Sequence, residues 1–333
     1  MSKAAQLAAL IGSGQAQGNK NLIINGAMQV AQRGTSHTTS VSTGYHTVDR
    51  IKIAGSSNIG QWTSSQDSDA PSGFTKSFKL DCTTADTSLS ANDHYGFQYM
   101  PEGFHMDSVG KGTSGAKSMT LSFYVKATVT KTMVVEFTDA SNSRHVNFAV
   151  TPSTTNTWER VSLSIPADTS GSFNQGTNSS AGEINFWLGA GTTYTSGSLQ
   201  SAWTSRVAAN IMAGVSNWAD STSNAIWIAG LQLEIGDVAT PFEHESYATT
   251  LQKCQRYYTV GGQKDSSGSG STTSSTTRYG VTMRAAPALS FGNSTQGAGT
   301  VLPAGTDWIS ATEFSAYVSS ASINFSYTAN AEL

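Results

Sequence analysis

The sequence predicts an all-β protein whose main part is two packed antiparallel sheets. The first observation is alternation of apolar and polar residues, clearest in Met119–Lys126 and in Leu231–Ile235. Alternation is typical of a strand with one buried face. The second is a series of turn clusters between such runs, for example Pro71-Ser72-Gly73. The third is a charged fraction of only 12% beside abundant Gly, Ser and Thr, which suits tightly turned β-structure.

Strand-like runs fill the chain between residues 21 and 247, and this span is the predicted sandwich domain. Their number and shortness favour two packed sheets over any helical arrangement. The expected strands are Leu22–Gln29, His46–Ile53, Gly60–Ser64, Thr75–Cys82, His94–Pro101, Met119–Ala127, Thr132–Asp139, Arg144–Val150, Trp158–Ile165, Glu183–Ala190, Ala208–Val215 and Ile226–Ile235.

The first twenty residues predict a short anchor segment. Leu7, Leu10 and Ile11 recur at helical spacing, and a helix this short needs a partner to be stable. We expect the segment to dock on another protein or on copies of this chain; a frayed terminus is the alternative. Its apolar run is too short for a secretory signal.

Residues 248–333 predict a helix or turn followed by a small β domain. The helix is expected over Thr249–Tyr258, and the low-complexity stretch Gly261–Thr277 is expected as a flexible linker, a tip loop or a hairpin. This part is too small to bury a good core alone, so segments of other subunits are expected to complete it. Its expected strands are Tyr279–Arg284, Ala288–Phe291, Thr312–Val318 and Ile323–Ala329.

Composition excludes several partners. The net charge is −3 with no basic run, which argues against binding duplex nucleic acid. No window approaches the ~20 apolar residues of a membrane span. The two cysteines, Cys82 and Cys254, are expected as free thiols, since a disulfide-stabilised secreted module usually has more.

No catalytic motif is present, and we expect no enzymatic activity and no catalytic residues. A cluster of Asp93, His94, Glu102, His105 and Asp107 would suit a metal or acid–base site if strands joined them; polar loop residues are the alternative. Glycan hydrolysis needs two carboxylates facing each other across a cleft, and nothing in the sequence pairs any. The candidates are Asp81, Glu102, Asp107, Glu136, Asp139 and Glu183.

Aromatic residues suggest where a sugar would bind, because exposed rings flanked by amides and hydroxyls stack on pyranose faces. Trp158, Trp187 and Trp227 lie in apolar runs and are expected in the core. Trp308, near a C-terminal loop, is a candidate receptor or subunit contact. The stacking candidates, with ordinary packing as the alternative, are Trp62, Tyr95, Tyr194, Trp203 and Trp218.

Several phrases carry a family resemblance: NLIINGAMQVAQRG, EGFHMDSVGKGTSGAKSMTLSFYVKAT, LQLEIGDVATPFEHESY with LQKCQRYY, and the ending YTANAEL. Together they resemble recurrent virion structural proteins of tailed bacteriophages, including phages of marine bacteria and cyanobacteria. The resemblance covers roughly residues 19–333. It implies a jelly-roll module similar to carbohydrate-binding modules.

The resemblance also implies a role on the particle. We expect a tail-fibre or tail-appendage subunit that forms a homotrimer, joins other virion proteins through its N-terminal segment and binds host cell-surface glycan. A capsid decoration or head fibre is one alternative, and a glycan-degrading tailspike is the other. We expect no cofactor, with a structural calcium ion at Asp81, Asp237 and backbone carbonyls as the alternative.

Overall fold

The computed structural model describes residues 20–39, 43–55, 59–140, 143–265, 273–292, 305–318 and 323–333. The chain divides into two compact units, Met1–Glu245 and Ser246–Leu333, and we describe each unit by itself. The division lies beside the boundary expected at residue 247. The predicted anchor side chains Leu7, Leu10 and Ile11 fall outside the described residues.

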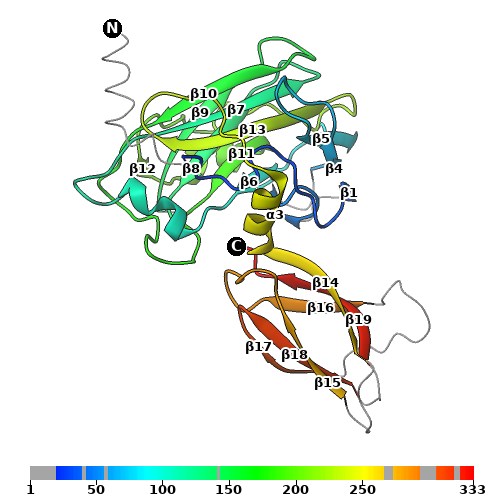
Figure 1. Ribbon diagram of the computed structural model, residues 1–333. Helices are drawn as coiled ribbons and strands as arrows, with labels where there is room; N and C mark the ends of the chain where they lie inside the picture. Colours follow the sequence, from blue (N-terminus) through cyan, green and yellow to red (C-terminus); the bar gives the residue numbers. More distant parts are fainter. Residues whose placement is uncertain are drawn as a thin grey trace. The chain divides into compact units, whose positions relative to one another are not determined.

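Unit 1 contains two antiparallel sheets (Figure 1). Sheet A has the strand order β1-β4-β5-β13-β7-β10. The closing strand of the sequence, β13, pairs with both β5 and β7 and is therefore an inner strand of this sheet. The strands of sheet A are β1 (Ser36–Thr39), β4 (Gln61–Asp67), β5 (Ser77–Thr84), β7 (Met119–Ala127), β10 (Glu159–Ile165) and β13 (Ala225–Ile235).

Sheet B packs against sheet A and has the order β12-β9-β8-β11-β6-β3-β2. Two antiparallel sheets that share one core make a jelly-roll β-sandwich, so the predicted fold class is confirmed. The strands of sheet B are β2 (Gly44–Tyr45), β3 (Ile51–Gly55), β6 (His94–Tyr99), β8 (Met133–Thr138), β9 (Arg144–Val150), β11 (Ile184–Ala190) and β12 (Thr204–Ser205).

The core lies between the two sheets and follows the predicted alternation. Met119, Leu121 and Phe123 of β7 are each at most 1% exposed. From sheet B, Phe97 and Phe186 stack with their ring centroids 4.6 Å apart, and Phe123 meets Phe186 edge to face at 5.3 Å. Such pairs contribute about 0.5–1.5 kcal/mol beyond the burial of their area. The aromatic contacts therefore join the two sheets as well as filling the space between them.

The opening segment does not form the strand predicted over Leu22–Gln29. Asn25 and Met28 have φ values of 61° and 59°, in the left-handed region, and this conformation interrupts a strand. Asn25 holds the turn because its side chain both donates to and accepts from the backbone of Val30. The apolar residues of this segment are thus buried by a turn and not by a sheet.

The opening segment nevertheless lies against the closing strand. The amide of Asn21 donates to the carbonyl of Leu231 at 3.2 Å and accepts from the N–H of Leu233 at 3.1 Å. The N–H of Leu22 donates to the carbonyl of Leu233 at 2.8 Å. These bonds join the beginning and the end of unit 1.

Among the described residues of unit 1, three short helices lie in the connections: η1 (Gly103–Val109), α2 (Thr192–Thr195) and η2 (Ala208–Asn210). The strand predicted over Ala208–Val215 is wrong, because η2 and turns occupy that stretch. Its apolar residues Ile211 and Met212 are 4% and 2% exposed and pack on the outward face of sheet B. The apolar residues that suggested a strand are therefore buried because this loop covers sheet B.

Unit 2 begins with helix α3 (Tyr247–Gln255), whose first turn is capped by the hydroxyl of Ser246 accepting from the N–H of Thr249 at 3.2 Å. Two three-stranded antiparallel sheets follow. The first has the order β14-β19-β16 and the second β15-β18-β17. Their strands are β14 (Tyr258–Asp265), β15 (Thr273–Arg278), β16 (Ala288–Gly292), β17 (Gly305–Ile309), β18 (Glu313–Val318) and β19 (Ile323–Asn330).

Two expectations for unit 2 are corrected. The low-complexity stretch Gly261–Thr277 contributes to β14 and β15, because its hydroxyl groups find partners there: Gln263 donates to Ser275 at 2.9 Å and accepts from Thr277 at 3.2 Å. The strand predicted over Tyr279–Arg284 is a loop. The N–H of Tyr279 and that of Met283 bind the carbonyls of a neighbouring loop, and no ladder continues there.

The two cysteines are free thiols, as predicted. Both are buried, and burial raises the pKa of Cys82 to about 11. This thiol therefore stays protonated and unreactive at neutral pH. No helix in the described part of the chain is both long and apolar enough to cross a membrane.

Candidate functional site

Five polar side chains form a row across the outward face of sheet B. The strand register places Lys52 opposite Gln98, Gln98 opposite Asn185, Asn185 opposite Glu136, and Glu136 opposite Asn147. Direct partners in antiparallel strands project from the same face. The row therefore runs at right angles to the strands, and we call these five residues the amide row.

The two central amides of this row lack good partners. The Nδ2 of Asn185 donates to Glu136 at 3.2 Å and to Glu183 at 3.1 Å, but its buried Oδ1 has no hydrogen-bond partner among the described residues. The Nε2 of Gln98 donates to the thioether sulfur of Met100 at 3.2 Å, and a thioether is a weak acceptor. Buried polar groups are normally satisfied, so this part of the row can accept further hydrogen bonds.

Glu136, next to Asn185 in the row, is fully buried and accepts several hydrogen bonds. Its carboxylate accepts from His145 Nδ1 at 2.9 Å, from Arg206 at 2.8 and 3.1 Å, and from Trp187 Nε1 at 3.1 Å. Burial alone would raise the pKa of Glu136, but the hydrogen bonds from His145 and Arg206 hold it below its ordinary value. Glu136 is therefore a charged, fixed group.

An apolar row runs beside the amide row. Ala54, Gly96, Trp187 and Val134 are successive partners across β3, β6, β11 and β8. Gly96 is required here because a Cβ at this position would lie 2.1 Å from the carbonyl oxygen of Phe186. Ile211 and Met212 of the loop over sheet B pack with Ala54, Trp187 and Val134 in one buried cluster, so this row is covered on its outward side.

Aromatic rings border the apolar row. His94 meets Trp187 edge to face at 5.6 Å and Tyr194 of α2 at 5.1 Å. Tyr194 is half-buried, so its ring keeps an accessible part. Among the five predicted stacking residues, it is the one that the structure places on the outward side of sheet B, where it packs against the apolar row.

A covering segment, residues 191–216, lies over the other end of the amide row. Asn147 Nδ2 donates to the carbonyls of Asn210 and Ile211 at 2.8 and 2.9 Å, and its Oδ1 accepts from the N–H of Gln200 at 2.6 Å. Asn147 is 1% exposed, whereas Lys52 at the opposite end is half-buried. The more exposed end of the row is therefore at Lys52, whereas Gln98 and Asn185 are themselves buried, at 6% and 0% exposed.

The other four stacking candidates are buried in the core, which is the alternative of ordinary packing. Trp62 and Tyr95 are each 1% exposed and stack on one another at 4.7 Å. Trp218 is fully buried, and Trp203 is 9% exposed. The indole N–H groups of Trp62, Trp203 and Trp218 donate to backbone carbonyls. The three indole rings are thus buried with their N–H groups satisfied, whereas the buried hydroxyl of Tyr95 has no hydrogen-bond partner among the described residues.

Two tryptophans expected in the core lie instead on outward faces. Trp187 belongs to the apolar row of sheet B. Trp227, on sheet A, lies between the ammonium groups of Lys79 and Lys126, at 4.9 and 4.5 Å from its ring. The phase of alternation could have shown this, because Trp227 follows the buried Ile226 by one residue and one residue reverses the face. Lysine stems cover the ring and keep it 8% exposed.

The calcium candidates are not brought together. Asp81 pairs in register with Ala225 at the start of β13, whereas Asp237 follows the end of that strand, about 30 Å away at the usual rise per residue. Asp81 also forms an ion pair with Lys79. Within the described ranges, no group of three or more His, Cys, Asp or Glu residues could hold a metal ion.

The predicted acid–base cluster is also separated. His94 begins β6, whereas Glu102 and His105 follow its far end. Asp139 instead forms an ion pair with the buried Lys111 at 3.5 Å. Of the six carboxylates considered from the sequence, the structure gives Glu136 and Glu183 a common partner, the amide of Asn185.

Comparison with known proteins gives no family. No family model matches the chain, and no curated protein matches it. Solved structures give distant likenesses. The tailspike protein 4 domain of bacteriophage CBA120 has a TM-score of 0.34 at 13% identity over 65% of this chain.

Two further likenesses involve carbohydrate-binding modules. A family 61 module solved with β-1,4-galactotriose has a TM-score of 0.30 at 8% identity and covers 66% of this chain and 100% of its own. The family 22 module and catalytic module of a Clostridium thermocellum xylanase, complexed with xylohexaose, give 0.30 at 13% over 65% of this chain. This chain spans 22% of the tailspike domain and 29% of the xylanase. At these scores, none of the three decides what this chain does.

Proposed function

We propose that this chain is a non-enzymatic carbohydrate-binding protein and that the amide row is its binding site. The observation that carries the proposal is the unpartnered Oδ1 of Asn185 beside the Gln98 amide, which donates to a thioether. A sugar hydroxyl both donates and accepts, so adjacent hydroxyls would satisfy both amides at once. The neighbouring Tyr194 supplies an aromatic edge of the kind that packs on a pyranose ring.

Met100 is the group that a sugar would displace. Its sulfur lies 3.2 Å from Gln98 Nε2 and 3.6 Å from Lys52 Nζ. Methionine is unbranched and changes rotamer at low cost, and a hydroxyl oxygen accepts more strongly than a thioether. Displacement of this flexible side chain would free the Gln98 amide and the Lys52 ammonium for a ligand.

The electrostatics of Glu136 argue against glycan cleavage. A glycosidase needs one carboxyl with a raised pKa that is protonated when it meets the substrate. The bonds from His145 and Arg206 lower the pKa of Glu136, so it has no proton to give. We therefore propose that the site binds sugar without cleaving it. In this proposal, Glu136 fixes the orientation of the Asn185 amide by accepting its hydrogen bond.

The proposed role on a particle follows from the sequence resemblance. We propose a tail-fibre or tail-appendage subunit of a tailed phage that attaches to the host through many weak sugar contacts. Multiple copies convert weak single-site affinity into strong attachment without new contacts. Electron microscopy of virions labelled with an antibody to this chain would distinguish the tail from the capsid surface.

A binding assay tests the proposed site. The full chain would be applied to a glycan array and titrated with xylohexaose and β-1,4-galactotriose as defined soluble probes. For any glycan bound, Gln98→Ala is expected to weaken binding about ten-fold, which is the loss of one good hydrogen bond in a buried site. Gln61→Ala, which removes an exposed amide from β4 on the other sheet, is the matched control and should bind as the natural chain does.

Two results would reject this function. One is absence of binding to every glycan on the array by the assembled protein. The other is unchanged affinity in Gln98→Ala. Shortening of host surface polysaccharide by the purified protein would show that the non-enzymatic part of the proposal is wrong.

A further inference from the structure

The second sheet of unit 2 has an outward face of unusual composition. In β15, Ser274, Thr276 and Arg278 are exposed, whereas Thr277 between them is buried. The register places Thr276 opposite Ser315 of β18, and Ser315 opposite Trp308 of β17. Because direct partners share a face, the Trp308 indole lies in line with a row of hydroxyl groups.

Trp308 is far more exposed than any other tryptophan that the structure places in a sheet. It is 42% exposed, whereas Trp187 and Trp227 are 5% and 8% exposed. An exposed indole costs solubility and has no role in the core of unit 2, which centres on Phe314, Phe325 and Tyr327. Exposure here points to a contact outside this unit.

An ion pair lies one step along the same face. Arg278 Nε donates to Glu313 Oε2 at 3.0 Å, and these residues are register partners at the end of the ladder. Glu313 precedes Ser315 by two residues, so the ion pair is about 7 Å from the Trp308 row. The side chain of Arg278 is 84% exposed, so its remaining donors are open to a ligand.

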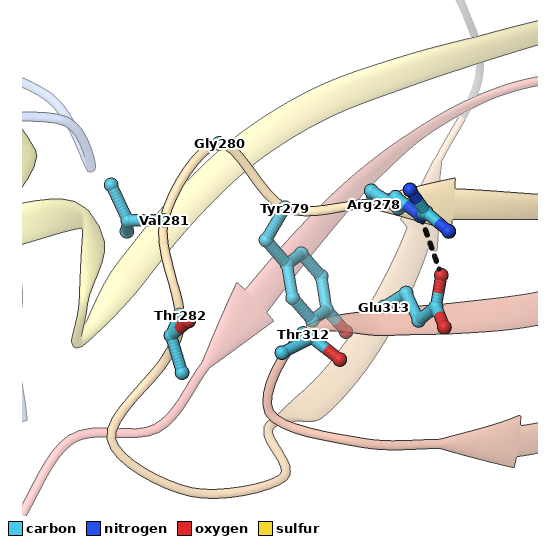
Figure 2. Close-up of a pocket in the computed structure, with 7 residues that line it drawn as sticks. All are labelled: Arg278, Tyr279, Gly280, Val281, Thr282, Thr312 and Glu313. Atoms are coloured by element: carbon cyan, nitrogen blue, oxygen red, sulfur yellow. Dashed lines mark hydrogen bonds and ion pairs between the residues drawn. The ribbon is translucent and has the colours of Figure 1, made fainter.

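A pocket of about 380 Å³ begins at this ion pair. Figure 2 shows Arg278 and Glu313 on one side of the Tyr279 ring and Val281 and Thr282 on the other. Tyr279 is 8% exposed, and its hydroxyl has no hydrogen-bond partner among the described residues. The other lining residues are Gly280 and Thr312.

The pocket wall is chemically neutral and polar. Burial raises the pKa of Tyr279 to about 12, so its hydroxyl remains a neutral group. The paired charges of Arg278 and Glu313 cancel. The volume lies at the lower end of the range for small-molecule sites.

From this arrangement we propose a second carbohydrate site on unit 2, formed by the Trp308 indole, the exposed hydroxyl of Thr276, and the pocket at Arg278 and Glu313. The ligand is a neutral, hydroxyl-rich oligosaccharide. One sugar ring packs on the indole face, and the next enters the pocket, where the guanidinium and the carboxylate bind its hydroxyls.

The test uses the full chain in a Gln98→Ala background, which weakens the amide row, so that the further change caused by a unit 2 substitution reports binding by unit 2. The probes are the same glycan array and any soluble oligosaccharide that it identifies. Residual binding is expected, and Trp308→Ala should weaken it about ten-fold or more, as loss of an aromatic anchor does. Arg278→Ala, at a side chain too exposed to affect folding, should weaken it as well.

Tyr247→Ala is the matched control, because it removes another exposed aromatic ring of unit 2 that lies on α3 and away from this face. It should leave binding unchanged. The second site is rejected if the Gln98→Ala background binds no glycan while the natural chain does, or if Trp308→Ala has no effect there. It is also rejected if Trp308→Ala abolishes an oligomer in light scattering and leaves glycan binding intact, since the indole would then contact a second copy.

The two substitutions distinguish failure of the proposed amide-row site from failure of the proposed unit 2 site. If Trp308→Ala weakens binding by the natural chain and Gln98→Ala does not, the amide row is wrong and the unit 2 site stands. The reverse result removes the unit 2 site and leaves the proposed function in place.

Discussion

At the scale of single residues, the amide row depends on one buried carboxylate. Glu136 accepts hydrogen bonds from Asn185, His145, Trp187 and Arg206, and the Arg206 side chain is itself 23% exposed. A buried ion pair is not a large source of stability by itself. Removal of one partner is costly because it leaves the other charge without compensation.

Glu136→Gln is therefore expected to destabilise unit 1 by about 3 kcal/mol, since the guanidinium of Arg206 would lose its counter-charge. Urea unfolding followed by tryptophan fluorescence measures this. Glu159→Gln is the control. Glu159 accepts from the backbone of Ser153 and Thr154 at the surface, where a charge contributes little. Equal stability of the two variants would contradict the structural role of Glu136.

At the scale of elements, strand β13 owes its shape to a bulge. Its pairing with β7 shifts register between Ala229 and Gln232, and Gly230 has a φ of +61°. A Cβ on Gly230 would lie 2.7 Å from the Phe74 ring and 2.9 Å from the Tyr124 ring. Glycine is therefore required at this one position for two reasons: the backbone has a positive φ, and the aromatic rings that pack over it leave no space for a Cβ.

Gly230→Ala is expected to destabilise unit 1 by about 2–4 kcal/mol, combining backbone strain with overpacking. Gly214→Ala isolates the backbone part, because Gly214 has a φ of +79° and nothing within 4 Å of its Cβ position. It should cost about 1 kcal/mol. Thermal melting of both variants gives the comparison. A Gly230→Ala protein no less stable than Gly214→Ala would show that the rings move aside freely.

At the scale of the whole molecule, acid should weaken unit 1. Burial alone would raise the pKa of Asp168, but hydrogen bonds from Arg144 and Lys111 hold it below its ordinary value, and Glu136 behaves in the same way. When the pKa of a carboxyl is lower in the folded state than in the unfolded state, the carboxyl stabilises the fold. This contribution is fully present above the pKa of the unfolded state, near 4, and it is lost as the pH falls through the pKa of the folded state.

The free energy of unfolding is therefore expected to change little between about pH 7 and 5 and to fall steeply below about pH 4. Urea unfolding at a series of pH values measures this. Asp168→Asn should flatten the acid limb because the titrating group is gone. A fall that begins near pH 6.5 would assign the loss to histidine and contradict this origin.

The two units should also differ in stability. The core of unit 2 is small, and small cores bury a lesser share of their surface. We expect unit 2 to unfold at lower denaturant than unit 1. Of the seven tryptophans, Trp308 alone belongs to unit 2, so far-ultraviolet circular dichroism should report an early step that tryptophan fluorescence barely registers. A single coincident transition by both probes would contradict this.

Alternation predicted most strands but did not locate the site. The bounds of β7 and β9 follow from their patterns, because one face of each packs on the core. The same pattern cannot tell which aromatic rings are exposed when both faces of a sheet are covered. Trp218 is buried among polar neighbours in the sequence, and Trp187 faces outward from an apolar run. The amide row was not predictable, since Gln98, Asn185 and Glu136 meet only through strand pairing across distant parts of the chain.

The hydrogen bonds between Asn21, Leu22 and strand β13 have a mechanical consequence. They join residues 210 positions apart, so tension that enters unit 1 near its first described residue and leaves after β13 passes through this short junction. The rest of the sandwich lies outside that load path. A module tethered in this way can be pulled taut while the outward faces of its two sheets stay undeformed.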